Sequence, residues 1–267
     1  MRHWRKHLFQ AATRQQIRSL QRTLKATHYE RVLDSQGLIK SALFSHFATA
    51  PVHGLDKHSA REPLAALFYQ HRYPVAKDQP AVERNRQLFA QTFGYTPQGA
   101  PDFGIAIPGS VSGSLKLPDR YHVALHATSR DSKLWASENW HALLTQLHET
   151  DHLPVLLPWG NDTEHARAQA IAAQLPFAQA CPPLTLLQAA HLLAHARAII
   201  GVDTGLLHLA NATNRPTIGI YTDSNPAKTG VQESPWATNL GGIGQPPSVS
   251  EVFNAVQRCL QNKDLAE

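Results

Sequence analysis

The sequence predicts an α/β protein made of two Rossmann-like halves, each built on a parallel sheet. Short apolar runs of β type alternate with segments of helical periodicity, and this alternation favours parallel strands joined by right-handed crossovers. Glycine and proline gather over residues 96–119, which indicates a boundary between domains 1–118 and 119–267. Because the alternation is regular only after this stretch, we expect the first half to be incomplete.

The first half is expected to begin with a basic helix within residues 1–25. A strand within 30–37 then ends in a glycine turn, and the apolar spacing of the next residues predicts a helix over 38–48. A short strand over 51–56 follows. The remainder reads as a helical and loop region that includes a helix over 81–94.

The second half shows the cleaner alternation. Ser137 is a candidate N-cap for the first helix after the boundary. Strands are expected at 121–128, 153–160, 197–203 and 216–222, and helices at 137–150, 163–175, 184–196, 204–213 and 250–263. Since ligands of open α/β sheets bind beyond the carboxyl ends of the strands, we expect a site at that edge.

Composition argues for an ordinary globular protein, with 42% hydrophobic residues and a net charge of +5. No run approaches the roughly 18 apolar residues of a membrane span, and the N-terminus lacks the apolar stretch of a secretory signal. Cys181 and Cys259 are too few for a disulfide framework or a zinc site. A cytoplasmic location is therefore the expectation.

Positive charge is concentrated at the start of the chain, where Glu30 is the single acid in the first thirty residues. Such a helix suits an anionic partner such as an acidic lipid or a phosphorylated glycan, although a solvated helix face is the alternative. Interleaved apolar residues leave contact with a membrane surface open. No nucleic-acid motif accompanies the charge, so nucleic acid is not an expected partner. The basic residues are Arg2, His3, Arg5, Lys6, His7, Arg14, Arg18, Arg22 and Lys25.

One stretch, GVDTGLLHLANATNRP at 201–216, places Asp203, Thr204 and Gly205 at a strand-to-helix turn. Such a turn presents free backbone N–H groups and the positive end of a helix dipole, which suits a phosphate. The alternative is that Asp203 or Thr204 only caps the helix.

Polar residues also follow the neighbouring predicted strands. Thr128 and Ser129 offer donors to a phosphate, Lys133 offers a positive charge, and Glu164 can accept hydrogen bonds from ribose hydroxyls. Leu184 can flank a base, Gly205 allows close approach of its backbone, and His208 follows one helical turn later. These are the residue types expected in a nucleotide-sugar site that has no bound metal. In such a site, fixed positive charge of the protein stabilises the departing diphosphate. Each residue could instead be a cap or a solvated side chain.

Other site templates fit less well. No GxGxxG or GxxxxGK[ST] motif follows a strand, and no GxSxG elbow occurs. His191 and His195 have i, i+4 spacing, but no HExxH motif is present. We interpret this histidine pair as helix surface and expect no metal site.

Five stretches of the sequence resemble those of glycosyltransferase family 9, in particular the heptosyltransferases that add the first heptose to the lipopolysaccharide inner core. They are VLDSQGLIKSAL (32–43), SAREPLAALFYQHRYPVAKDQPAVERNRQLFA (59–90), HATSRDSKLW (126–135), LLPWGNDTEHARA (156–168) and GVDTGLLHLANATNRPTIGIYTDSNP (201–226). The initial RHWRKHLF also agrees. The resemblance is ordered along essentially the whole chain, so it is more specific than any one motif.

The resemblance implies a GT-B fold and inverting transfer of L-glycero-D-manno-heptose from ADP-heptose to a Kdo sugar of Kdo-lipid A, at the cytoplasmic face of the inner membrane. It implies no obligatory cofactor and leaves Mg²⁺ open. Lys133 would stabilise the leaving group, and Leu184 would lie near the adenine. The implied donor-binding residues are Thr128, Ser129, Lys133, Glu164, Leu184, Asp203, Thr204, Gly205 and His208. The basic N-terminal helix would face the anionic acceptor through Arg2, Arg5, Lys6 and, further along, Lys40.

The chain departs from the family at its start. Members begin with a hydrophobic strand and a Gly-Asp loop whose aspartate serves as general base, whereas Met1 here falls where relatives are already in their basic helix. We therefore expect a truncated N-terminal domain and impaired activity. Asp34 belongs to a different motif and does not inherit the role. Alternatives are a non-catalytic remnant that binds ADP-sugar, and another sugar-nucleotide enzyme that resembles heptosyltransferase II or an epimerase.

Overall fold

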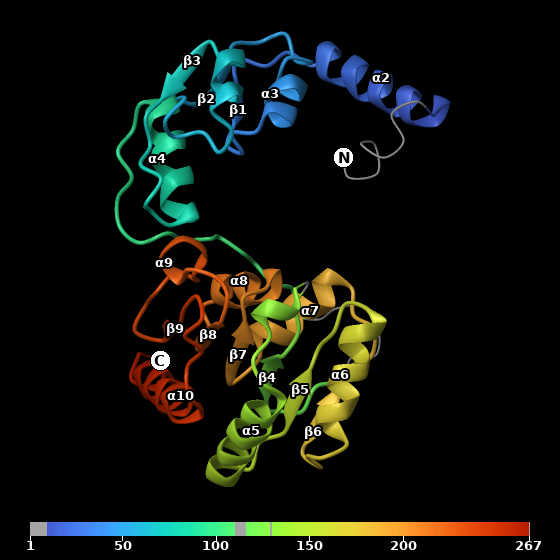
Figure 1. Cartoon of the computed structure of the whole chain (residues 1–267), viewed down its shortest axis with the longest axis vertical. Helices are drawn as coiled ribbons and strands as arrows, with labels where there is room; N and C mark the ends of the chain where they lie inside the picture. The colour runs from blue at the N-terminus through green and yellow to red at the C-terminus, as the bar shows by residue number, and fades with distance from the viewer. Residues whose placement is uncertain (1–9, 110–115, 129, 267) are drawn as a thin grey trace. The chain divides into compact units, whose positions relative to one another are not determined.

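The computed structural model describes residues 10–109, 116–128 and 130–266 (Figure 1). Its contacts divide the chain into two compact units, residues 1–99 and 100–267. Among the described residues, the first unit holds a parallel sheet of order β1-β2-β3. The second holds a parallel sheet of order β6-β5-β4-β7-β8-β9. The predicted α/β class with parallel sheets is confirmed.

The first unit follows the predicted order of strand, helix and strand, with two additions. Its elements are α2 (Ala11–Ala26), β1 (Val32–Asp34), α3 (Ile39–Ser45), β2 (Val52–Leu55), the 3₁₀ helix η1 (Pro63–Phe68), β3 (His71–Tyr73) and α4 (Ala81–Phe93). No local pattern predicts β3, whose three residues are polar or aromatic and largely exposed. That region was expected to hold only helix and loop, so this expectation is wrong.

The sheet of the first unit is covered on both faces, because side chains of a strand alternate between faces. Val32 and Val52 pack with Ala42 of α3 and with η1 on one face. Leu33 and Leu55 pack with Leu88 of α4 on the other. The carboxyl ends of β1 and β2, which carry Asp34 and Asp56, are left at one edge of the sheet.

The second unit contains every strand and helix predicted for it and four short elements that were not predicted, η2, β6, α9 and β9. Its elements are β4 (His122–Leu125), η2 (Asp131–Lys133), α5 (Ser137–Asp151), β5 (Val155–Leu157), α6 (Asp162–Ala172), β6 (Ala178–Ala180), α7 (Leu186–Ala194), β7 (Ala198–Val202), α8 (Gly205–Ala212), β8 (Thr217–Tyr221), α9 (Pro226–Thr229), β9 (Ala237–Gly241) and α10 (Val249–Asp264).

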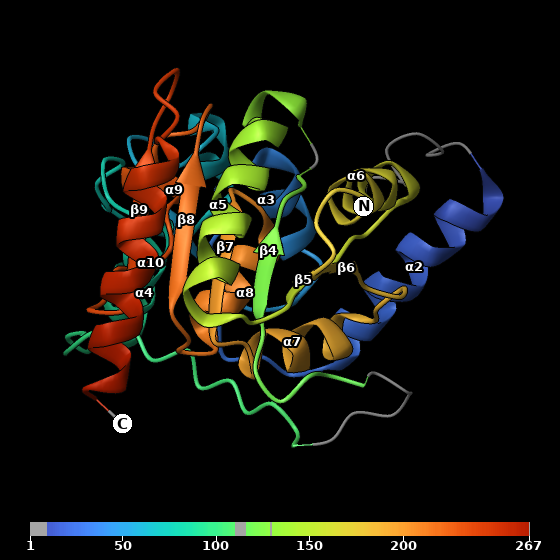
Figure 2. The same cartoon turned by 90° about the horizontal axis from the view of Figure 1, so that it is seen from below.

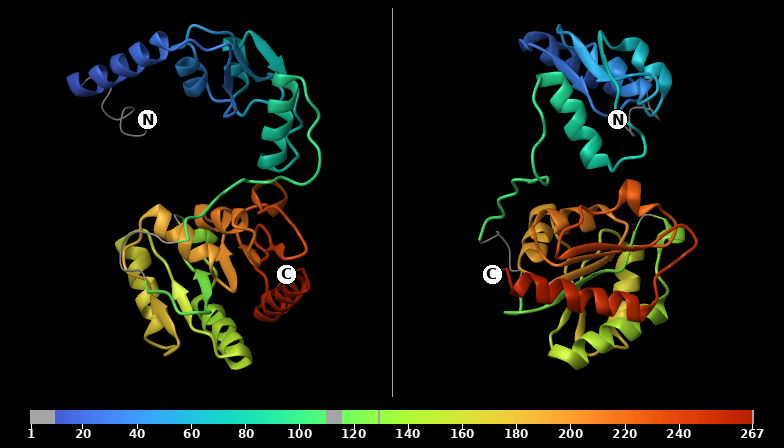
Figure 3. Two further views of the ribbon diagram at one scale, coloured as in Figure 1. Left: turned by 180° about the vertical axis from the view of Figure 1, so that it is seen from behind. Right: turned by 90° about the vertical axis from the view of Figure 1, so that its left-hand side faces the viewer.

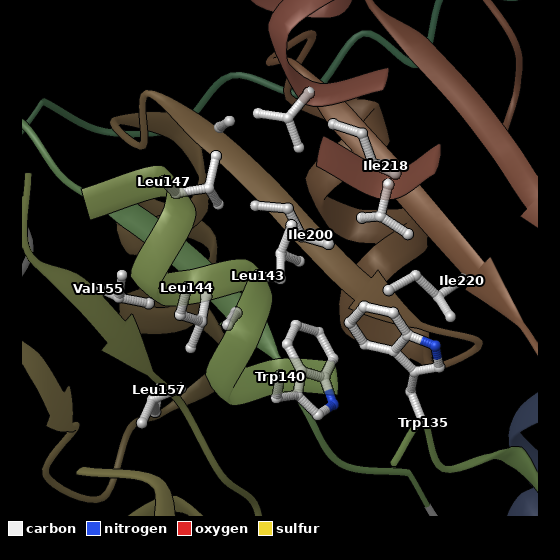
Figure 4. Packing of buried hydrophobic residues seen from close by; sticks show 14 of the residues in the cluster. Trp135, Trp140, Leu143, Leu144, Leu147, Val155, Leu157, Ile200, Ile218 and Ile220 are labelled. Atoms are coloured by element: carbon white, nitrogen blue, oxygen red, sulfur yellow. The ribbon is translucent and has the colours of Figure 1, made fainter. Parts of the chain in front are cut away.

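The second sheet lies between two helical layers (Figure 2). Helices α5, α6 and α10 supply the larger core cluster, in which Trp135 and Trp140 meet edge to face (Figure 4). Helix α10 runs beside α5 on this face (Figure 3). Helices α7 and α8 bury Leu192 and Leu207 against the opposite face. Both layers leave the carboxyl ends of the strands uncovered by helix bodies, so loops form that edge.

The cap prediction at Ser137 is wrong. The N-cap of α5 is Ala136, and no side chain caps the helix there. By contrast, Ser248 caps α10 through a reciprocal capping box with Glu251, in which the serine accepts from the backbone N–H and the glutamate accepts from Ser248 N–H.

Candidate functional site at the carboxyl ends of the second sheet

The centre of the site is the carboxylate of Asp203, the first residue after β7. Its Oδ2 atom lies 2.5 Å from Nζ of Lys133 and 2.6 Å from Oγ of Ser224. The side chains of Asp203 and Lys133 are only 9% and 12% exposed. The structure therefore brings together two predicted residues that are 70 positions apart in the chain.

Thr128 joins this centre from the end of β4. It is buried, and its hydroxyl donates a hydrogen bond of 3.0 Å to the backbone carbonyl of Asp203. In this structure the hydroxyl thus holds two adjacent strand ends together, although it was predicted to face a phosphate. Its contact positions the loop that continues into η2 and Lys133.

The turn at Thr204 and Gly205 begins α8. Thr204 occupies the N-cap position, but its side chain makes no capping hydrogen bond, and the Asp203 carboxylate is bound by Lys133 and Ser224. The alternative that either side chain caps α8 is therefore wrong. A Cβ added to Gly205 would meet nothing within 4 Å. The N-terminus of α8 is open to an anion, which its N–H groups and dipole favour.

His208 lies one turn into α8 and belongs to the same electrostatic neighbourhood. Desolvation lowers the pKa of His208 below its usual 6.5; the Lys133 charge also lowers it, whereas the Asp203 charge raises it. The imidazole is therefore neutral near pH 7. A neutral ring retains both a donor and an acceptor nitrogen.

Glu164 lies in the first turn of α6, and the start of this helix contacts the loops after β4 and β5. Its Oε2 accepts a hydrogen bond of 2.8 Å from the backbone N–H of Gly160, in the loop after β5. Arg167 donates to Asp131 at 2.8 Å, and Nε2 of the buried His126 lies 3.2 Å from the Glu164 carbonyl oxygen. These contacts place the start of α6 against the η2 loop that carries Lys133.

The remaining predicted residues are placed as follows. Leu184 is half-buried and packs against the core cluster beneath α7 and α8. Lys40 is exposed on α3 of the first unit. Ser129, Arg2, Arg5 and Lys6 lie outside the described residues.

Asp34, at the end of β1 in the first unit, is a buried and saturated carboxylate. It accepts hydrogen bonds of 2.7 Å from both the Ser41 hydroxyl and the Tyr69 hydroxyl, and one of 2.9 Å from Gln36 N–H. It is 4% exposed. Its three donors come from the loop after β1, from α3 and from the residue that follows η1, so this carboxylate joins elements of the first unit.

Two further features of the second unit lie away from this centre. A cavity of about 480 Å³ is lined in part by Phe103 and Trp236, and none of the predicted site residues lines it. His191 of α7 and His195, the C-cap residue of that helix, contact each other, and His195 Nδ1 lies 2.8 Å from the His191 carbonyl oxygen. Within the described ranges, no group of three histidine, cysteine or acidic residues could hold a metal ion.

Ser224 is the contact that sequence reasoning missed. It belongs to the polar run Thr222-Asp223-Ser224-Asn225 directly after β8, at the same edge as the other strand ends. That position was the available signal, since polar residues after a parallel strand face the ligand edge of the sheet.

Comparison with known proteins agrees with the resemblance of the motifs. Residues 17–261 match the family model of glycosyltransferase family 9 (heptosyltransferase). Lipopolysaccharide heptosyltransferase 1 of Salmonella typhimurium is 40% identical over 232 residues, which are 86% of this chain and 73% of that protein.

Two solved structures are similar as well. Escherichia coli heptosyltransferase WaaC with ADP superposes with a TM-score of 0.83 at 35% identity, over 97% of this chain and 81% of that one. The same enzyme with ADP-2-deoxy-2-fluoro heptose gives a TM-score of 0.81 at 35% identity, over 98% and 81%. The two α/β units thus correspond to the GT-B-type fold that the motifs implied, and this chain belongs to glycosyltransferase family 9, the heptosyltransferases.

Proposed function

We propose that this protein transfers L-glycero-D-manno-heptose from ADP-heptose to a Kdo sugar of Kdo-lipid A during synthesis of the lipopolysaccharide inner core. The single observation that carries the proposal is the match of residues 17–261 to the heptosyltransferase family model. The donor side is assigned to residues 119–267 and the acceptor side to residues 1–118. The solved WaaC structures contain ADP and an ADP-heptose analogue, which supports the choice of donor.

The proposed reaction is an inverting displacement at the anomeric carbon. The acceptor hydroxyl oxygen forms a bond to that carbon and its proton passes to water. The bond from that carbon to the β-phosphate oxygen breaks, and its electron pair leaves with ADP. Lys133 and the backbone N–H groups of Thr204 and Gly205 would stabilise the negative charge that develops on the diphosphate. No bound metal is needed for this step, because the positive charge is supplied by the protein.

The remaining donor contacts are proposed from the same edge of the sheet. Glu164 would accept from the ribose hydroxyls, Leu184 would lie against the adenine, and Thr128, Ser129, Asp203 and His208 would complete the binding of the phosphates and sugar. Lys40, Arg2, Arg5 and Lys6 would face the anionic acceptor. Asp34 is not proposed as the base that takes the acceptor proton, a choice supported by the three hydrogen bonds that its buried carboxylate accepts.

A transfer assay tests the proposal. Purified protein is mixed with ADP-heptose and Kdo-lipid A, and the product is sought by mass spectrometry as Kdo-lipid A carrying one added heptose. Titration calorimetry with ADP is run on the same preparation. Binding together with transfer is expected; binding without transfer would favour the alternative of a non-catalytic ADP-sugar-binding protein. Absence of ADP binding would overturn the proposed function.

Peripheral contact with the anionic inner membrane is proposed for the basic N-terminal region. Within α2, Arg14, Arg18, Arg22 and Lys25 recur at helical spacing, and Ile17, Leu20 and Leu24 lie on a neighbouring stripe. A helix with a basic stripe beside an apolar one suits an acidic lipid surface. None of the helices in the described ranges has the length and apolar character to cross a bilayer.

Vesicle flotation tests this contact. The protein should float with vesicles that contain phosphatidylglycerol and stay behind with vesicles of phosphatidylcholine alone. The double variant Arg18→Glu, Arg22→Glu should no longer float, whereas Lys77→Glu, in the same unit, should float like the wild type. Flotation that is unchanged in the double variant would exclude α2 as the contact.

A further inference from the structure

The Asp203 carboxylate oxygen that binds Lys133 has a second donor. Oδ2 receives the ammonium of Lys133 at 2.5 Å and the hydroxyl of Ser224 at 2.6 Å. The carboxylate is 9% exposed, so solvent offers it little replacement for a lost partner.

The loop that carries Ser224 also holds the loop that carries Lys133. The Thr222 hydroxyl donates 3.0 Å to the backbone carbonyl of Ser132, the residue before Lys133. The segment after β8 therefore contacts Asp203 directly through Ser224, and it contacts the residue before Lys133 through Thr222.

The Lys133 ammonium has two anionic partners once a diphosphate is bound. In the structure it neutralises the charge of the Asp203 carboxylate. In the proposed function, on which this inference rests, it also binds the leaving diphosphate. Loss of a donor raises the free energy of a nearly buried carboxylate, because its desolvation is no longer offset by a hydrogen bond. A second donor on the same oxygen lowers that cost.

We infer that Ser224 is a positioning residue that stabilises Asp203 while Lys133 engages the diphosphate of the donor. The Ser224 hydroxyl does not touch the reacting atoms. It acts through Asp203, so that the ammonium is shared between carboxylate and diphosphate instead of being held by the carboxylate alone.

The test is a double-mutant cycle read by titration calorimetry with ADP. Ser224→Ala should weaken ADP binding about tenfold, the equivalent of one hydrogen bond to a charged group. Ser224→Thr keeps the hydroxyl and should bind like the wild type. In an Asp203→Asn background, Ser224→Ala should change the affinity by less than about twofold, because the two residues act as one unit.

Two controls separate this role from a structural one. Ser250→Ala removes a hydroxyl from an exposed serine on α10 and should leave ADP binding unchanged. The KM for the sugar nucleotide should rise in Ser224→Ala, whereas the KM for the acceptor should not change. The thermal midpoint should fall modestly, because the nearly buried Asp203 loses one donor.

The outcomes distinguish the inference from the proposed function. Equal ADP affinity of the wild type and Ser224→Ala, or full tenfold loss in the Asp203→Asn background as well, would overturn the positioning role and leave the heptosyltransferase proposal intact. A lowered thermal midpoint with unchanged affinity would overturn it too. A wild type that does not bind ADP would overturn both.

Discussion

Lys133 Nζ and Asp203 Oδ2 lie 2.5 Å apart, and this contact links η2 to the loop after β7 across the carboxyl edge of the second sheet. Neither side chain is more than 12% exposed. A pair so poorly solvated interacts more strongly than a surface ion pair, and removal of one partner leaves the other uncompensated. The pair therefore has a stability role as well as the proposed role in donor binding.

Replacement of Lys133 by methionine should separate these two roles. ADP binding, measured by calorimetry, should weaken by about 10- to 100-fold, because a charge-assisted contact to the diphosphate is lost. Urea unfolding should show a loss of about 1–3 kcal/mol, since among the described residues Asp203 would keep Ser224 alone as a side-chain donor. Lys77→Met, an exposed lysine of the first unit, serves as the control and should alter neither quantity. Unaltered ADP affinity in Lys133→Met would remove this lysine from the donor site.

Tyr69→Phe should destabilise the first unit. The Tyr69 hydroxyl donates 2.7 Å to Asp34 inside the core, and burial, followed by this hydrogen bond and the Asp34 charge, raises the pKa of Tyr69. Loss of one donor to a buried carboxylate should cost about 1–3 kcal/mol in urea unfolding. Tyr95→Phe, on a tyrosine that is 52% exposed, should be neutral. Equal stability of Tyr69→Phe and the wild type would show that Asp34 does not depend on this donor.

The spacing of apolar residues was sufficient to predict the helices that have a continuous apolar face and the strands that are buried along their whole length. Strands β4, β7 and β8 are fully buried runs, and α5 and α10 each present a regular apolar face to them. The strand β3 carries no such pattern, because His71 and Arg72 are exposed at the edge of a three-stranded sheet. Its pairing with β2 is set by the tertiary structure, which a local pattern does not encode.

The candidate site shows the same division. The placement of Asp203 and Lys133 at one sheet edge follows from the order of strands and could be predicted. Two hydrogen bonds could not be predicted: the one from the Thr128 hydroxyl to the Asp203 carbonyl, and the one from Gly160 N–H to the Glu164 carboxylate. Both depend on the directions of side chains in the folded loops. Ser224 was overlooked for the same reason, although its position after β8 was visible.

The ion pair of Arg197 and Asp264 should make the stability of the fold depend on pH. Two hydrogen bonds from Arg197 lower the pKa of Asp264 below its ordinary 3.8; burial opposes them slightly, and the charges of Arg197 and Arg120 add to the lowering. Because the folded value is the lower one, the pair stabilises the fold above about pH 3.8 and loses this contribution as the pH falls through the folded value.

Urea unfolding of the wild type and Asp264→Asn measures this contribution. At pH 6 the variant should be less stable by about 0.2–1 kcal/mol, a small difference because the Asp264 side chain is 49% exposed. At pH 3, below the ordinary pKa of 3.8, the difference should be smaller than at pH 6. Asp78→Asn, in the other unit, is the matched control. A difference that persists unchanged at pH 3 would show that Asp264 acts through packing and not through its charge.

Gly205→Ala should improve stability and impair donor binding at once. An added Cβ meets no atom within 4 Å, and alanine is the better helix former, so unfolding should cost up to about 1 kcal/mol more. The same Cβ would stand at the open N-terminus of α8, where the diphosphate is proposed to approach the backbone, so the Kd for ADP should rise. Gly242→Ala, where a Cβ also meets nothing, controls for glycine removal and should leave ADP binding unaltered. If Gly205→Ala gained stability with no change in the Kd, the diphosphate would have to bind elsewhere than at this helix terminus.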